Sequence, residues 1–286
     1  MDSIDIFSAA LRALMLMVVV SISGGALVPL WSRGPRSLPP PAGRGALAVP
    51  LAATFVILVH RALDAARLAG EWSGVVSRHL QFLAWSSSAG RASLACLVGV
   101  GAIACSRVAP TSKSAAIGVG GAIVVPASFA LTGHTTQAEY AAVLRVVLAV
   151  HVLLVAFWLG GIGHLASMVR AASLPTLAAE ARAFSRHAIW LVPPITLAGV
   201  MLVCGLLPTP SAIVSVYGLG IICKALAFSA AIAFASWNRY RAVPALLAGD
   251  TTACSPFLRS LRLEQTILLL ALTITAVVTT LTGPTQ

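Results

Sequence analysis

The chain consists of long runs of apolar residues separated by short polar segments. Eight such runs cover roughly residues 6–31, 46–62, 89–106, 115–133, 143–169, 188–207, 214–237 and 265–283. A helix needs about 20 predominantly apolar residues to cross the hydrocarbon core of a bilayer. The sequence therefore predicts an all-α, polytopic membrane bundle of about eight transmembrane helices.

The segment between the second and third runs has a different pattern. Residues 71–88 contain the stretch EWSGVVSRHLQFLAW, in which most apolar side chains recur at helical spacing. The positions that share one face are Trp72, Val75, Val76, His79, Phe82 and Leu83. This pattern is typical of a helix that lies in the membrane interface.

The composition excludes a soluble globular protein. Hydrophobic residues make up 58% of the 286 positions and charged residues only 9%, whereas soluble domains carry roughly 25% charged residues. Eight spans leave no room for a sizeable soluble domain. The five cysteines form no CxxC pair, which favours small buried hydrophobes over disulfides or a zinc site. A cleavable signal peptide is not expected, because the N-terminus opens with Asp2 and Asp5 and its apolar run continues to Trp31.

The formal net charge of +11 is distributed unevenly among the predicted loops. Basic residues concentrate in the first, third, fifth and seventh loops, while the sixth has no charge. The basic residues are Arg33, Arg36, Arg44, Arg107, Lys113, Arg170, Arg182, Arg186, Arg239, Arg241, Arg259 and Arg262. The positive-inside rule places these loops in the cytoplasm and both termini on the periplasmic side. Charges dispersed in this way mark topology and do not indicate a nucleic-acid partner; membrane lipid is the expected surrounding.

Few ionisable residues fall inside the predicted spans, and such residues are costly there. They are Arg12, Arg91, His151, His164 and Lys224, with His60, His134 and Arg145 near span ends. Acidic side chains are nearly absent from the runs. Their absence argues against a pump built on a relay of carboxylates.

His151 is the sharpest candidate among them. It stands in AVHVLLVAFWLGG, with Trp158 seven residues later on the same helical face. Gly160 and Gly161 follow and allow another helix to approach closely. The imidazole either forms a hydrogen bond between helices or ligates a metal, since it suits copper, zinc and haem iron. His164 lies about 20 Å farther along the helix and cannot share an ion with it, so we interpret it as a polar residue of the cytoplasmic end.

His134 stands in LTGHTT, where an apolar run reaches the outer side of the membrane. A short loop joins its helix to that of His151. His60 and His79 fall on the same predicted side. We expect His134 and His151 to be the metal-binding residues, acting as successive stations of an inward path and not as one closed site.

Several stretches of the C-terminal half, taken together and in order, resemble the CopD family of bacterial copper-resistance membrane proteins. They are TGH at 132–134, HVLLVAFWLGG from His151, FSRHA at 184–188, YGLGIICKALAF followed by NRYRAVPAL, and RSLRLE at 259–264. The chain departs from the family pattern at Leu219, where a basic residue is common, and at His164, where an apolar one is expected. The resemblance divides the chain into N-terminal transmembrane helices, 1–110, and a CopD-like transmembrane domain, 111–286.

The resemblance implies an inner-membrane protein of eight spans that handles copper. The expected activity is copper import from periplasm to cytoplasm as part of copper homeostasis or resistance. The copper ion is then the transported substrate, received from a periplasmic copper-binding protein of the CopC type. An enzyme is not expected, because GxSxG, HExxH and Walker motifs are absent. Two alternatives stay open: a haem-binding membrane redox protein, and a scaffold for copper delivery to membrane enzymes.

Overall fold

The computed structural model describes residues 3–32, 46–108, 111–136, 138–207 and 209–282, and within these ranges every regular element is helical. The long helices are α1 (Ser3–Leu27), α2 (Ala48–Ala69), α4 (Ser88–Val108), α5 (Ser112–Phe129), α6 (Ala141–Met168), α7 (Leu174–Leu206), α8 (Val216–Trp237) and α10 (Cys254–Leu281). The short ones are η1 (Val28–Leu30), η2 (Trp72–Val76), α3 (Arg78–Ser86), η3 (His134–Thr136), η4 (Pro210–Val214), the π-helical turn η5 (Asn238–Ala242), α9 (Val243–Leu247) and η6 (Thr251–Ala253).

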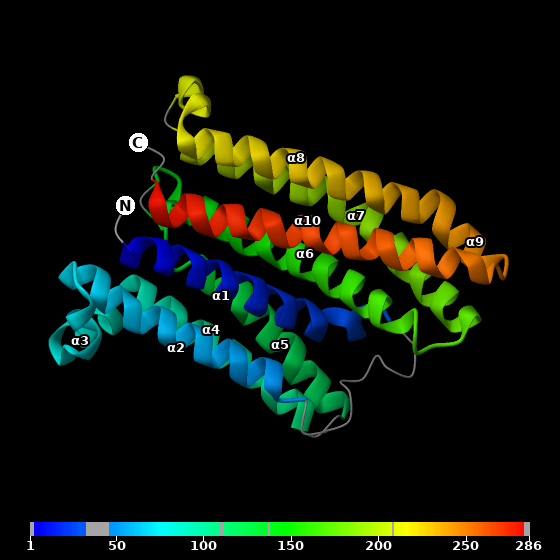
Figure 1. The fold of residues 1–286 in the computed structure, drawn as a ribbon, viewed down its shortest axis with the longest axis horizontal. Coiled ribbons are helices and arrows are strands. Elements are labelled where there is room, and N and C mark those ends of the chain that lie inside the picture. Colours follow the sequence, from blue (N-terminus) through cyan, green and yellow to red (C-terminus); the bar gives the residue numbers. More distant parts are fainter. Residues whose placement is uncertain (1–2, 33–45, 109–110, 137, 208, 283–286) are drawn as a thin grey trace.

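The prediction of an all-α bundle with eight spans is confirmed. Eight helical stretches of the described residues are long and apolar enough to cross a membrane. Helix α1 lies in the middle, between α6 and α10 on one side and α2, α4 and α5 on the other (Figure 1). The start of α1 and the end of α10 lie at the same end of the bundle, as an even number of spans requires (Figure 1).

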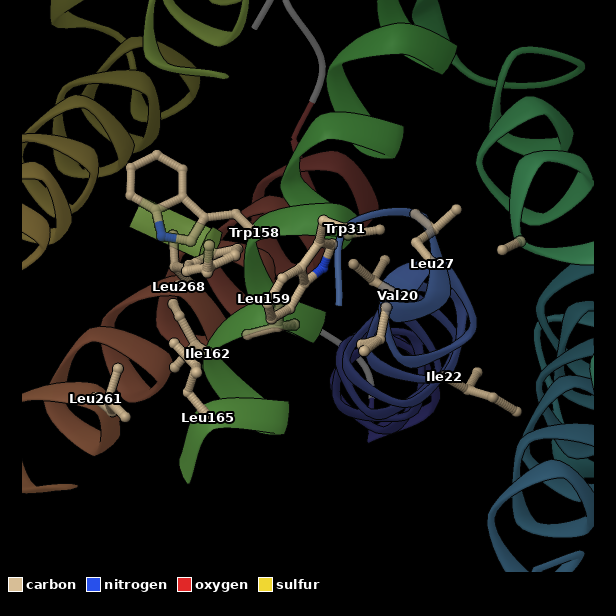
Figure 2. Close-up of a cluster of buried hydrophobic side chains, with 14 of the residues drawn as sticks. Val20, Ile22, Leu27, Trp31, Trp158, Leu159, Ile162, Leu165, Leu261 and Leu268 are labelled. Carbon is tan, nitrogen blue, oxygen red and sulfur yellow. The ribbon is translucent and has the colours of Figure 1, made fainter. Parts of the chain in front are cut away.

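The centre of the bundle is held by the contact between α1 and α6. A Cβ on Gly24 would collide with the backbone of Ala156 and Gly160, and one on Gly160 would collide with Gly24. The two backbones therefore touch, as the glycine pair of α6 predicts. Figure 2 shows Leu159 on the side of α6 that faces α1, while Trp158 projects toward the opposite side.

Helices α7 and α10 begin well before the apolar runs that predict them. Helix α7 starts at Leu174 and not near residue 188, and α10 starts at Cys254 and not near residue 265. In the first turns of α7, Leu177, Ala181 and Phe184 are buried at helical spacing, whereas Arg182 and Arg186 are exposed. Hydropathy detects only the uniformly apolar part of such a helix, since an amphipathic beginning averages out.

The segment predicted to lie at the interface is helical, but in two pieces. Ser77 separates η2 from α3, and its side chain accepts a hydrogen bond from the Leu80 amide at 3.4 Å. Val76 and Phe82 are 84% and 71% exposed, so apolar side chains remain on the outside of both pieces. That the segment lies on a membrane surface stays a prediction, as does the domain division after residue 110, which the α1–α6 contact crosses.

Candidate functional site

His151 lies in α6 where that helix faces α7 and α8. Its ring donates a hydrogen bond to the backbone carbonyl of Ile195 in α7, and a Cβ on Gly199 would be 3.9 Å from its Cε1 atom. Lys224 of α8 is close enough to interact electrostatically with the imidazole. The Nδ1 atom of His151 is buried and has no hydrogen-bond partner. A nitrogen in this position has a lone pair or a proton that the described protein atoms leave unused.

The prediction for His134 is only partly open to comparison with the structure. Its backbone belongs to η3, which packs against α6, but its side chain lies outside the described part of the chain. Nearby, the Arg145 guanidinium donates to the Thr136 carbonyl at 3.5 Å. His151 is ten residues beyond the start of α6, which corresponds to roughly 15 Å along the helix. The two histidines thus belong to different levels of the bundle.

No group of three His, Cys, Asp or Glu side chains among the described residues is arranged to hold a metal ion. The roles of His134 and His151 as copper ligands therefore stay predictions.

His60 and His164 have partners of their own. His60 is buried in α2 with its Nδ1 atom 4.0 Å from Asp64, which also forms an ion pair with Arg61. The Nε2 atom of His164 is 3.8 Å from Glu180 of α7, and its ring meets Trp31 edge-on at 5.5 Å. These contacts agree with the interpretation of His164 as a polar residue separate from His151.

The cysteines only partly follow their prediction. All five are free. Cys96 is buried, but Cys105, Cys204 and Cys223 are exposed on the outside of the bundle. In a membrane bundle an apolar side chain need not face the protein core, because lipid is equally apolar.

Sequence reasoning missed a polar centre formed by Glu264. This carboxylate is only 2% exposed, within α10. Its Oε1 atom accepts a hydrogen bond from the Trp158 indole at 2.5 Å, and its Oε2 atom accepts one from the Asn238 amide at 3.0 Å. Three elements, α6, η5 and α10, thus meet at one acidic group.

A cavity of about 350 Å³ adjoins this centre. Glu264, Asn238 and Arg239 line it among mostly apolar side chains from α6, α7, α8 and α10. The Arg239 guanidinium donates to the Ser185 carbonyl at 2.8 Å and to its hydroxyl at 3.0 Å. The cavity is therefore apolar along its walls and polar at one edge.

A periodicity signal for Glu264 was present in the sequence. Phe257, Leu261 and Leu268 lie seven and three residues before it and four after it, and all three are buried. These spacings place Glu264 on the buried face of its helix. The predicted last apolar run begins one residue later, at 265. Hydropathy therefore assigns the carboxylate to the charged segment before the span and not to the buried part of the helix.

No curated protein and no solved structure matches the chain. Residues 178–278, which include Glu180, Asn238 and Glu264, match the family model described as CopD, Copper resistance protein D. This match supports membership of the chain, a multi-pass membrane protein, in the CopD family of copper-resistance proteins.

Proposed function

We propose that the chain transports copper ions across the inner membrane, from periplasm to cytoplasm, and so contributes to copper homeostasis or resistance. The observation that carries the proposal is the buried Nδ1 atom of His151, which has no hydrogen-bond partner in a membrane-spanning helix. Leaving such a group unsatisfied costs about 1–3 kcal/mol. A group retained at that cost suits a transient ligand, and neutral imidazole is a good ligand for copper.

In this proposal His134 and His151 act in sequence. His134 lies in the turn before α6, where a periplasmic donor of the CopC type can reach it. His151 receives the ion about 15 Å farther along the helix. The copper ion is cargo, so each station needs ligands that release it as readily as they bind it.

The test is copper uptake into cells or vesicles, normalised to the amount of protein in the membrane. We expect His134→Ala to raise the external copper concentration needed for uptake, because capture is impaired. We expect His151→Ala to abolish uptake at every concentration, because the deeper step is lost. The matched control is His187→Ala, since His187 is exposed and its ring is bonded to the Ala183 carbonyl within its own helix at 2.8 Å.

If His151 only joined two helices, His151→Ala would lower the abundance of the protein and leave normalised uptake unchanged. That result contradicts the proposal. Wild-type protein that binds copper but moves none across a vesicle membrane contradicts it as well, and favours a scaffold for copper delivery.

A further inference from the structure

Glu264 is a buried acid whose hydrogen bonds come from neutral groups. Each of its oxygens accepts one bond, from the Trp158 indole and from the Asn238 amide. Burying a carboxylate with no cation bonded to it is costly, and protonation is the usual way in which that cost is relieved.

Among the described residues, no cationic side chain is bonded to Glu264, whose partners are Trp158 and Asn238. From η5, Arg239 lines the same cavity but donates to Ser185, and Tyr240 lines it from an exposed position. The remaining groups on the packed or cavity-lining elements are Arg241 of η5, Asp5 and Arg12 of α1, Arg145, His151 and His164 of α6, Glu180, Arg182, Arg186, His187 and Cys204 of α7, Tyr217, Cys223 and Lys224 of α8, and Cys254, Arg259 and Arg262 of α10. Of these, His164 interacts with Glu180, and Arg259 and Arg262 are exposed.

Asn238 supplies a second, independent observation. Its side chain is 7% exposed, and its Oδ1 atom is buried with no hydrogen-bond partner. An amide side chain offers a donor on one side and an acceptor on the other. In the structure the Nδ2 group donates to Oε2 of Glu264, the arrangement that an ionised carboxylate requires. After a half-turn of the amide, the Oδ1 atom can accept the O–H of a protonated Glu264.

We propose that Glu264 and Asn238 form a proton-binding site, and that this proton is taken up and released during copper transport. The proton comes from water that reaches the polar edge of the cavity, forms an O–H bond at Oε2 of Glu264, and returns to water when that bond breaks. The amide of Asn238 turns to suit each state. The coupling to transport rests on the proposed function, whereas the proton-binding site does not.

A single carboxylate is sufficient for this role. A relay needs several groups in a row, but one acid that is ionised in one state of the protein and protonated in another binds one proton per cycle. Glu264 differs in this respect from Glu180, the other buried acid of α7 and α10, whose carboxylate faces His164 at 3.8 Å. The pairing makes Glu180 the natural control.

Trp158 provides a reporter within the site. Its indole N–H bonds directly to Glu264, so protonation of the carboxylate changes its fluorescence. We expect purified wild-type protein to show a fluorescence titration with pH that is lost in Trp158→Phe and in Glu264→Gln but retained in Glu180→Gln. A titration that persists in Glu264→Gln would overturn the proposal.

Infrared difference spectra of the wild-type protein give a second measurement that needs no variant to fold. Acidification should produce the carbonyl band of a buried protonated carboxyl group, and this band should remain in Glu180→Gln. No such band, together with no Trp158 titration, contradicts the proposal. Asn238→Leu removes both the amide donor to the ionised carboxylate and the amide acceptor for the protonated one. Because a hydrogen bond to the charged form is the stronger of the two, the titration midpoint should move to higher pH. An unchanged midpoint would overturn the part assigned to Asn238.

The coupling is tested by measuring copper uptake into proteoliposomes while the pH is varied on one side of the membrane. That side is the predicted cytoplasmic side, to which Arg239 belongs. We expect wild-type uptake to depend on this pH and the dependence to be lost in Glu264→Gln. If Glu264→Gln keeps the wild-type pH profile, the coupling is wrong while copper transport stands. If no copper moves but Trp158 titrates through Glu264, the proposed function is wrong while the proton-binding site stands.

Discussion

His151, Lys224 and Glu264 represent three ways in which single polar side chains are accommodated within this apolar bundle. Each oxygen of Glu264 accepts a hydrogen bond from a neutral donor, His151 keeps one buried nitrogen without a partner, and Lys224 is half-buried near that imidazole. The His151 Nδ1 atom can therefore offer a lone pair to a metal ion, which the Lys224 ammonium group cannot. The charge of Lys224 opposes a cation at His151, which suits a station that must release its ion.

Lys224 is therefore expected to control passage and not to bind the ion. A charged ammonium group has three donors and no lone pair, so it cannot ligate copper. We expect Lys224→Met to reduce copper uptake while copper binding by the purified protein stays intact. Lys113→Met, which removes an exposed ammonium group in the first turn of α5, is the matched control and should change neither quantity. Loss of stoichiometric binding in a folded Lys224→Met protein would contradict this role.

At the scale of elements, the contact between α1 and α6 depends on two glycines that face each other. Gly160→Ala would place a Cβ against the backbone of Gly24, which no side-chain rotation can relieve. Forcing extra atoms into a packed contact typically costs about 1–3 kcal/mol. We expect Gly160→Ala to lower the unfolding temperature in detergent.

Gly101 in α4 is the matched control for this prediction, because a Cβ there meets nothing within 4 Å. Replacing a helical glycine by alanine at such a position stabilises a helix by about 0.5–1 kcal/mol. Gly101→Ala should therefore leave the unfolding temperature unchanged or raise it. An equal change in unfolding temperature for the two variants would contradict a direct backbone contact between Gly24 and Gly160.

The elements were more predictable from the sequence than the contacts between their polar groups. The bilayer imposes long apolar runs, so the spans and the close approach at Gly160 could be read locally. The bond between Trp158 and Glu264 joins residues 106 positions apart. No sequence motif links these two residues. The spacing of buried apolar residues around Glu264 indicates that it faces inward, but it does not identify Trp158 as its partner. The extended beginnings of α7 and α10 were missed because their polar faces lower the average hydropathy.

At the scale of the whole molecule, α6 connects the sites discussed above. The turn that contains His134 packs against this helix, His151 lies about 15 Å from its start, and Trp158 follows roughly 10 Å farther on. The indole of Trp158 reaches Glu264 at the edge of the cavity. The predicted stations and the buried acid thus lie at successive levels of the bundle. They form an inward path if the start of α6 faces the periplasm and its end faces the cytoplasm.

That order is the last prediction, and it rests on the asymmetry of basic residues. We expect the turn before α6 to face the periplasm and the segment after α9 to face the cytoplasm. Glu139 and Ala248 are exposed positions in these two places, whereas Thr135 is too buried to label well. In a background without the five native cysteines, an impermeant thiol reagent should label Glu139→Cys in intact cells. It should label Ala248→Cys only after the membrane is permeabilised, which also controls for reactivity. The reverse pattern would invert the bundle, place His134 on the cytoplasmic side and turn the proposed import path into an export path.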